Sequence, residues 1–399
     1  MSGRRPRVFM MDLWATVPYY TAYLSRALRN QNVDVQVGSI SYYLDPGCFT
    51  SRGLTVDPGL MDVVGKFRLP QLPRRVLKLA EAMLNLSALT ARFAASAPDV
   101  VHVQYLPMLQ WRVPLDLWFL DFCRRRGSKI VLTVHDLLPH DTGEAYKATF
   151  HDLYQRVDRI ICHSDSIRAR LAAEFSVPGE KVSVIPHGPF FYDLPAAGSE
   201  AALRSFELEA CKLLVLWQGI LFPYKGVDVL LAAWQKVEAT TDNACLVIAG
   251  TGAPELLEQV RAQVAALNLQ RVKLHFRFIS TEELVALYRA ADVVVYPYHA
   301  ITTSGALATG LALGKTIVAT DLPVFREVLT DHETALLVPP KDPGALAGAL
   351  TELLQDAELR GQLAARVRAM DFGDQSWLSI AEKTIEAYET ATGQSFGSA

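Results

Sequence analysis

Short runs of branched and aromatic residues alternate along the chain with longer stretches in which apolar residues recur every three or four positions. The short runs are almost continuously apolar, which is typical of parallel strands covered on both faces of a sheet. The longer stretches have the spacing of amphipathic helices. In the first half of the chain we expect strands, each with the turn that follows it, within residues 7–11, 33–40, 99–105, 129–141, 159–165 and 181–189.

The alternation lapses at residues 190–208, which we interpret as a linker, and a second series of strands and helices follows. Its expected strands are 213–219, 245–250, 272–276, 293–297, 316–320 and 335–339, and its expected helices are 226–237, 254–267, 281–291 and 342–355. Alternating strands and helices predict an α/β fold with parallel sheets. We therefore predict two doubly wound, Rossmann-like domains facing each other across a cleft, at residues 1–192 and 209–372, with an amphipathic segment, 373–399, returning to the first domain.

Composition bounds the class of protein. A chain of 399 residues, 50% of them hydrophobic, is long enough for two cores. The net charge of −3 argues against a dedicated nucleic-acid binder. No signal peptide and no run long enough to span a membrane is recognised. The five cysteines have no ligand spacing and are interpreted as reduced thiols of a cytoplasmic protein.

The stretch YPYHAITTSGALATGLALGKTIVA, residues 296–319, joins two apolar strands through a small-residue helix. We expect the first helical turn at Thr302, Thr303, Ser304 and Gly305, and the end of the helix at Gly314. The start of a helix has unpaired N–H groups and the positive end of its dipole, so it favours an anion such as phosphate. The alternative is an ordinary Ser or Thr N-cap with no ligand.

A second candidate is LWQGILFPYKGVDVLL, residues 216–231, in which Gly219 ends a strand and Lys225 precedes a helix. An ammonium group on this loop is expected to reach an anion at the start of the 302–305 helix. Together they would stabilise the charge that develops on a pyrophosphate leaving group. The alternative is a solvated surface lysine.

His135 follows a buried strand in TVHDLLPHD and is a candidate for binding a sugar or moving a proton. The alternative is a histidine that caps its own loop, and His140 and His187 are weaker candidates of the same kind. No histidine–carboxylate pair has the helical spacing of a metal site, so no metal is expected.

Two segments, 66–86 and 111–129, mix Arg and Lys with Leu, Trp and Phe, as helices that lie on a membrane surface do. The alternative is a pair of ordinary amphipathic helices packed on a sheet. A role at a membrane surface is therefore kept as a hypothesis.

Taken together, the motifs LTVHDLLPHD, KVSVIPHG, GILFPYKGVDVLLAAW, LVIAGTG, AADVVVYPY and LTDHETALLVPPKDPGAL resemble those of the family 4 glycosyltransferases of GT-B architecture, over nearly the whole chain. The resemblance implies a retaining transfer of a sugar from a nucleotide-sugar to an acceptor hydroxyl, without an essential metal or other cofactor. It implies that Lys225 binds phosphate, that His135 lies beside the transferred sugar, and that the backbone around Arg277 and Phe278 lies by the base.

The chain departs from the family pattern at several positions. Ile220 stands where the family has an arginine, and Ile301 and Thr309 stand where it has two glutamates. The glycine-rich loop after the first strand is replaced by ATVPYY. These departures resemble a bacterial subgroup associated with polysaccharide assembly. We expect hydroxyl and backbone contacts of residues 302–304 to compensate for them.

The sequence therefore predicts a retaining hexosyltransferase that uses a nucleotide-diphosphate sugar and acts on a glycan or lipid-linked acceptor, with Tyr19 and Tyr20 on the acceptor side. We place it in the cytoplasm, with a peripheral position at the inner membrane face as a hypothesis, and expect no nucleic-acid partner. Two alternatives stay open: a catalytically silent GT-B protein that binds a nucleotide or a partner enzyme, and a nucleotide-sugar epimerase.

Overall fold

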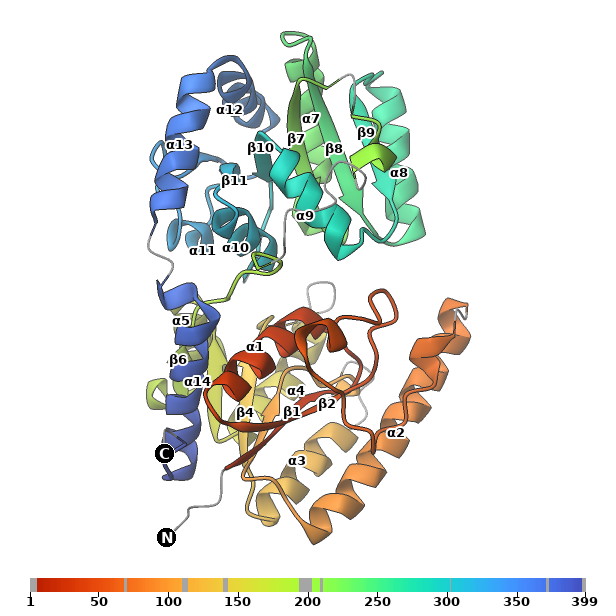
Figure 1. Ribbon diagram of the computed structural model, residues 1–399, viewed down its shortest axis with the longest axis vertical. Helices are drawn as coiled ribbons and strands as arrows, with labels where there is room; N and C mark the ends of the chain where they lie inside the picture. The colour runs from red at the N-terminus through yellow and green to blue at the C-terminus, as the bar shows by residue number, and fades with distance from the viewer. Residues whose placement is uncertain are drawn as a thin grey trace. The chain divides into compact units, whose positions relative to one another are not determined.

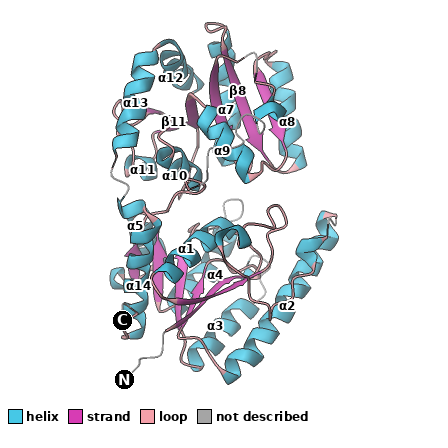
Figure 2. Cartoon of the chain, viewed as in Figure 1, coloured by secondary structure: helices cyan, strands magenta, loops and turns pink. Residues whose placement is uncertain are grey.

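The computed structural model describes residues 6–396, except 68–69, 110–113, 139–142, 194–202, 209–210, 302 and 371–372. The chain divides into two compact units. Unit 1 is Met1–Gly188 with Gly373–Ala399, and unit 2 is Pro189–Phe372. Figure 1 shows a parallel sheet covered by helices in each unit, and Figure 2 marks the same strands and helices by type.

Unit 1 is built on a six-stranded parallel sheet with the order β2-β1-β3-β4-β5-β6. Its strands are nearly continuous apolar runs and are buried over most of their length. They are β1 (Arg7–Asp12), β2 (Asp34–Ser39), β3 (Val100–Val103), β4 (Lys129–Val134), β5 (Arg159–Cys162) and β6 (Val182–Val184). The helices are α1 (Pro18–Asn30), α2 (Gln71–Ala95), α3 (Leu115–Arg125), α4 (Gly143–Arg156), α5 (Asp165–Phe175) and α14 (Trp377–Thr392).

The C-terminal helix α14 belongs to unit 1, where it packs against α1, β4 and β5. The Trp377 ring stacks on Tyr23 of α1 with the ring centroids 5.3 Å apart. The Tyr388 hydroxyl lies 2.6 Å from Nδ1 of His102 on β3. The prediction that the C-terminal segment returns to the first domain is confirmed.

Unit 2 repeats the architecture with the strand order β12-β11-β10-β7-β8-β9, again all parallel. Its strands are β7 (Leu213–Gln218), β8 (Ala244–Gly250), β9 (Val272–Phe276), β10 (Val293–Tyr296), β11 (Thr316–Thr320) and β12 (Leu336–Val338). Its helices are α7 (Val227–Glu238), α8 (Pro254–Ala266), α9 (Thr281–Ala290), α10 (Gly305–Ala312), α11 (Pro323–Arg326), α12 (Pro343–Gln355) and α13 (Ala357–Ala369). The prediction of two doubly wound parallel sheets is confirmed.

Each sheet has a point where the chain changes direction along the strand order. In unit 1 this point lies between β1 and β3, and in unit 2 it lies between β7 and β10. In open α/β sheets, ligands bind beyond the carboxyl ends of the strands at such a point. The loops after these four strands are therefore the first places to look for a site.

The cysteines correct one prediction from the sequence. Cys211 and Cys245 form a disulfide, with their Cα atoms 5.5 Å apart, while Cys48, Cys123 and Cys162 are buried free thiols. Cys245 lies on β8 and Cys211 just before β7, and the register of these two strands brings the cysteines together. The prediction that all five are reduced is wrong, and the argument for a reducing compartment loses that support.

None of the helices in the described part of the chain is long and apolar enough to cross a bilayer.

Candidate functional site

Two glycines at the carboxyl ends of β7 and β8 shape the first loop of unit 2. Gly219 and Gly250 have φ angles of +152° and +150°. A Cβ atom on Gly250 would lie 1.8 Å from the carbonyl oxygen of Gly219, so a larger residue cannot fit. The Gly219 amide donates to the Ala249 carbonyl over 3.1 Å. The backbones at these two strand ends therefore lie too close together for a side chain at position 250.

The loop after β7 is fastened to the loop after β10. The Pro223–Lys225 turn ends at Gly226, which has a φ angle of +67°. A Cβ atom on Gly226 would lie 1.9 Å from the Pro297 carbonyl oxygen. The His299 amide donates to the Tyr224 carbonyl over 2.7 Å. These contacts fix the position of Lys225 relative to the stretch that leads into α10.

The Lys225 ammonium lies over the aromatic floor of this loop. Its Nζ atom is 5.6 Å from the ring centroid of Tyr298 and 6.0 Å from that of Trp217, within the range of a cation–π interaction. It is also 2.8 Å from the position that a Cβ atom would take on Gly219. Glycine at position 219 therefore leaves the room that the ammonium group occupies.

The helix α10 begins with an N-cap. The Ser304 hydroxyl accepts from the Leu307 amide over 3.1 Å, and α10 starts at Gly305. The amides of Gly305 and Ala306 have no carbonyl one turn earlier in the helix and lie at the positive end of its dipole. The start of α10 can therefore stabilise an anion.

The helix starts later than the sequence suggested. Thr302 lies outside the described residues, Thr303 precedes the helix, and Ser304 has extended backbone angles. The first turn was predicted to begin at Thr302. The helix begins three residues later than predicted, because Ser304 is its N-cap and lies outside the helix.

Tyr298 connects these elements, and the sequence analysis did not single it out. Its side chain is 1% exposed, and burial raises the pKa of the phenol far above its usual value. The hydroxyl interacts electrostatically with the Ser304 side chain but has no partner in hydrogen-bond geometry within the described residues. Through Tyr298, the structure brings Lys225, Gly219 and Ser304 into one neighbourhood.

Of the predicted site residues, Phe278 lies apart from that neighbourhood, while Thr309, which stands where the family has a glutamate, lies one turn into α10. Phe278 follows β9, the edge strand, which β8 separates from β7. Its carbonyl accepts from Nη1 of Arg277 over 3.2 Å. The Thr309 hydroxyl donates to the Gly305 carbonyl over 2.8 Å and accepts from the Phe190 amide over 3.1 Å. Thr309 is thus bonded to the backbone of its own unit.

In unit 1, His135 lies just past the end of β4 and lines a cavity of about 230 Å³. The loops after β1 and β3 supply part of the lining with Thr16, Val17, Gln104 and Tyr105. Most of the other lining side chains are apolar: Leu106, Leu109, Leu132, Val134, Phe150 and Leu153. The cavity is therefore lined by the loops after β1, β3 and β4, at the carboxyl ends of the strands, where a ligand is expected.

An aromatic cluster packs against the His135 ring. It consists of Tyr20, His135, His163, His187 and Trp377, and the Tyr20 ring centroid lies 4.7 to 5.3 Å from those of the other four. Burial lowers the pKa of His163 to about 4 and that of His187 to about 3, and it lowers the pKa of His135 well below its usual value. All three imidazoles are therefore neutral near pH 7.

Gln104 sets the tautomer of His135. The Gln104 amide nitrogen lies 3.1 Å from both Met10 Sδ and His102 Nε2, which accept, and its carbonyl oxygen lies 3.0 Å from His135 Nε2. Since that oxygen can only accept, the hydrogen-bond pattern assigns the proton of His135 to Nε2. His102 in turn lies 2.6 Å from the Tyr388 hydroxyl, so the network reaches α14.

The loop after β1 is organised by a buried carboxyl group. Asp12 accepts from the amides of Thr16 and Val17 over 2.8 and 3.0 Å, and burial raises its pKa to about 6. The amide groups of this loop are therefore occupied by Asp12. On the next helix, the Tyr19 hydroxyl donates to Asp45 over 2.9 Å, whereas Tyr20 points into the aromatic cluster.

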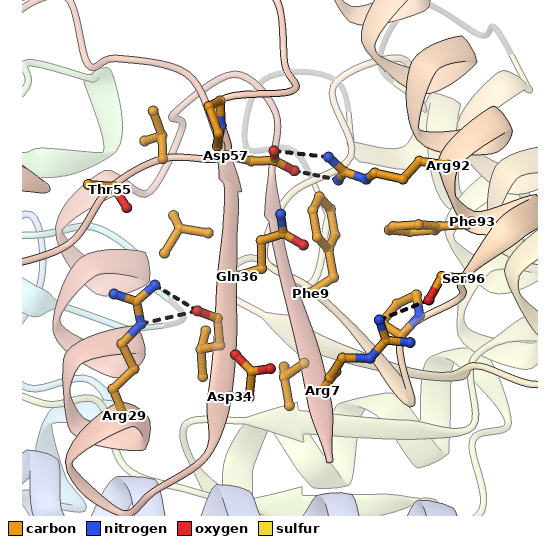
Figure 3. A pocket seen from close by; sticks show the side chains of 16 residues that line it. Arg7, Phe9, Arg29, Asp34, Gln36, Thr55, Asp57, Arg92, Phe93 and Ser96 are labelled. Carbon is orange, nitrogen blue, oxygen red and sulfur yellow. Dashed lines mark hydrogen bonds and ion pairs between the residues drawn. The ribbon is translucent and has the colours of Figure 1, made fainter. Parts of the chain in front are cut away.

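A larger cavity, of about 480 Å³, lies at the other end of the unit 1 sheet, where β1 and β2 begin. Figure 3 shows three arginines around it, each hydrogen-bonded to another residue of unit 1. Arg29 donates twice to the Val35 carbonyl, Arg92 pairs with Asp57, and Arg7 donates to Ser96. Arg29 thus bonds the edge strand β2 directly, and Val56 bridges β2 at Val37, so part of its free edge is covered, as edge strands require. We assign the cavity a structural role.

In the described part of the chain, no three His, Cys, Asp or Glu side chains gather in an arrangement that could hold a metal ion.

Comparison with known proteins agrees with this geometry. Residues 17–188 match glycosyltransferase family 4, and residues 212–356 match the family described as glycosyl transferases group 1. The first match falls in unit 1 and the second in unit 2.

Individual relatives point the same way. A D-inositol 3-phosphate glycosyltransferase from Xylanimonas cellulosilytica is 26% identical over 94% of this chain and 91% of its own. A phosphatidyl-myo-inositol mannosyltransferase from Mycolicibacterium smegmatis is 31% identical over 43% of each chain. The structure of Anabaena HepE in complex with UDP and glucose has a TM-score of 0.74 at 15% identity, over 97% of this chain and 100% of its own. With two parallel sheets and a returning C-terminal helix, the chain belongs to the nucleotide-sugar-dependent glycosyltransferases of family 4 and group 1, which have the GT-B fold.

Proposed function

We propose that the protein is a retaining hexosyltransferase that moves a sugar from a nucleotide-diphosphate sugar to a hydroxyl group of a glycan or lipid-linked acceptor, in polysaccharide or glycolipid biosynthesis. The observation that carries the proposal is in unit 2. There the Lys225 ammonium, Gly219 and the start of α10 meet around Tyr298, at the carboxyl ends of β7 and β10. This is a cationic site of the kind that a diphosphate needs.

In this proposal the diphosphate binds between Lys225 and the first amides of α10, with Thr303 and Ser304 beside it. As the bond to the sugar breaks, negative charge grows on the leaving diphosphate. The ammonium group and the helix start are already fixed in place, so they stabilise that charge without reorganisation. We therefore propose that no metal is required. The base binds toward Phe278.

Unit 1 supplies the acceptor side. We propose that His135 orients the transferred sugar as a neutral imidazole, since its surroundings disfavour the charged form. Tyr20 acts indirectly, because it is 2% exposed and holds His135 in the aromatic cluster, while Tyr19 positions the neighbouring loop. The relatives named for inositol phosphate and phosphatidyl-myo-inositol support a polyol-bearing or lipid-borne acceptor. We propose that the enzyme works in the cytoplasm at the inner membrane face.

One observation favours a second candidate, a catalytically silent protein that binds a nucleotide or a partner. The Thr309 hydroxyl already forms hydrogen bonds with the backbone of unit 2, so it is not positioned to bind a ribose hydroxyl. Ile220 and Ile301 have no polar group that could bind the donor.

The first proposal includes the polysaccharide-assembly subgroup that the motifs resemble.

Turnover separates the two candidates. Purified protein is incubated with a panel of nucleotide-sugars, with and without polyol and lipid acceptors, and the released nucleoside diphosphate is measured. We expect one donor to be consumed, and Lys225→Met to lower kcat roughly 10²- to 10³-fold, as the loss of a transition-state donor does. Lys236→Met, at an exposed lysine on α7, is the matched control and should leave kcat unchanged. A folded protein that binds a donor and never turns it over supports the silent candidate and refutes the first.

A further inference from the structure

Helix α2 has two apolar faces, and only one of them is buried. The inward face packs in the core of unit 1 through Ala82, Leu86, Leu89 and Phe93. The outward face follows helical spacing and is exposed from Val76 to the end of the helix. Its residues are Val76, Leu77, Ala80, Met83, Leu84, Ser87, Ala88, Ala91, Ala94 and Ala95. Figure 1 shows α2 running along the outer side of unit 1.

The outward face carries no charged side chain between Val76 and Ala95. The four charged or amide side chains in that range are bonded to other parts of unit 1, three of them to residues 57–63 and Lys78 to the loop after β1. Glu81 accepts from the Val63 amide, Asn85 bonds both backbone groups of Met61, Arg92 pairs with Asp57, and Lys78 donates to the Trp14 carbonyl. The helix therefore has an apolar face in the core, polar groups that are bonded to other parts of unit 1, and an uncharged, mostly apolar face in the solvent.

An ordinary surface helix turns charged residues to water on the side away from the core, whereas α2 turns apolar residues to water there. Val76 is 55% exposed and Leu84 is 54% exposed. The segment that Glu81 and Asn85 hold beside α2 adds two more exposed apolar side chains, Met61 and Val63. A contiguous apolar surface of this kind marks a contact with an apolar partner.

The charge at one end of the surface identifies the partner. Exposed Lys66 and Arg75 and half-buried Arg74 lie near the start of α2, and Phe67 beside them is 58% exposed. The acids near this end, Asp62 and Glu81, accept hydrogen bonds from Ser41 and the Val63 amide, and neither forms an ion pair with these cations in the described part of the chain. An apolar stripe next to cationic residues matches a bilayer with anionic headgroups.

We infer that the outward face of α2, together with segment 61–67, is a docking surface for an anionic lipid bilayer. The helix lies in the plane of the interface, where the stripe from Val76 to Ala91 is about 24 Å long at 1.5 Å per residue. The inference deepens the proposed function, since it brings the enzyme to lipid-borne acceptors. Its observations come from α2 and segment 61–67 and do not depend on donor binding in unit 2.

The test is sedimentation of the full chain with vesicles of phosphatidylcholine containing 30% phosphatidylglycerol, and with vesicles of phosphatidylcholine alone. We expect binding to the anionic vesicles that weakens with salt. Leu84→Asp should lower the partition coefficient roughly tenfold or more, since a leucine side chain leaves the apolar phase and a charge enters it. Arg75→Glu should lower it several-fold on anionic vesicles only.

Leu378→Asp is the matched control, because Leu378 is a 56% exposed leucine on another helix of unit 1. It should leave vesicle binding unchanged. Circular dichroism and thermal melting check that every variant is folded. Absence of vesicle binding, or binding that Leu84→Asp does not alter, overturns the inference. So does a wild-type dimer in sedimentation velocity that Leu84→Asp converts to a monomer without any lipid binding, since the occupant is then a second copy. Nucleotide-sugar turnover in the absence of lipid is measured separately, so a failure of the proposed function is distinguished from a failure of docking.

Discussion

At the scale of single residues, the candidate donor site depends on glycines at positions where no larger residue fits the backbone. Gly226 combines a left-handed backbone with a contact that leaves no space for a side chain, because the Pro297 carbonyl lies where its Cβ would be. Lys225 immediately precedes Gly226 in the sequence, so the conformation of this turn fixes the position of the lysine. The aromatic floor of Tyr298 and Trp217 then fixes where the ammonium lies.

We predict that Gly226→Ala destabilises unit 2 by about 1 to 3 kcal/mol, the usual cost of a strained backbone position. It should also weaken donor binding, because the turn that holds Lys225 is displaced. Gly348→Ala is the control, since Gly348 lies in α12 with open space around it and alanine favours a helix. Denaturant unfolding of both variants checks the prediction. An unchanged unfolding free energy for Gly226→Ala would show that the turn is not strained.

Gln104 is a positioning residue for His135. Gln104→Leu removes the acceptor of the His135 Nε2 proton, so the imidazole loses both its tautomer and its orientation. We predict a roughly tenfold fall in kcat, the value of one hydrogen bond, with little change in the KM for the donor. The pH dependence of kcat should also shift, which loss of packing alone would not cause. A variant with unchanged kcat and pH profile would contradict the assigned tautomer.

At the scale of elements, buried histidine side chains make the stability of unit 1 depend on pH. Four histidines on the loops and strands of its sheet have a lowered pKa: His102 and His187 to about 3, His163 to about 4, and His135 well below its usual value. In the unfolded chain all four bind protons below about pH 6.5, whereas in the folded chain they do not. The unfolded state thus gains protons first as the pH falls, and stability is lost.

Two carboxyl groups act in the opposite direction. Burial raises the pKa of Asp12 to about 6 and that of Asp116 to about 7, so acidification stabilises the folded state through them. Four imidazoles against two carboxyl groups leave a net loss of roughly 3 kcal/mol per pH unit between about pH 6 and 4. Hydrogen exchange of β4 and β5 amides over this range measures it, with His163→Gln expected to show a shallower slope. Stability that stays constant or rises on acidification would refute the prediction.

Most elements were predictable from the sequence, because a strand buried on both faces needs a continuous apolar run. Each of the twelve strands of the described chain coincides with an expected segment, and only β1 and β8 extend one residue beyond it. Helix α13 was not predicted, since most of its side chains are polar or exposed and only Leu363 and Val367 are buried. The aromatic cluster was also missed. His163 and His187 come from different strand ends, and only the folding of the sheet brings them to Tyr20.

At the scale of the whole molecule, the disulfide is the feature that the sequence could least reveal. Cys211 and Cys245 are 34 residues apart, and nothing in their spacing indicates that the starts of β7 and β8 are neighbours. The bond ties the chain that enters unit 2 to the second strand of its sheet. It lies at the amino ends of these strands, whereas Lys225 follows the carboxyl end of β7.

We predict three reactive thiols in the denatured chain without reductant and five after reduction. Mass spectrometry after alkylation counts them directly. Reduction should lower the unfolding free energy of unit 2 by about 3 kcal/mol, as the opening of a loop of this length does. Five thiols alkylated before reduction would show that the disulfide is not formed in the isolated protein.

If Lys225 and the start of α10 bind the diphosphate of the donor, affinity must depend on the phosphates and on this lysine. Calorimetric titration of nucleoside diphosphates and the matching nucleosides into wild type, Lys225→Met and the control Lys236→Met measures both. We predict that the preferred diphosphate binds far more tightly than its nucleoside. Lys225→Met should lose roughly 10- to 100-fold of diphosphate affinity, the value of a charge-assisted hydrogen bond, with nucleoside affinity unchanged. Equal diphosphate binding by Lys225→Met and wild type would contradict the account.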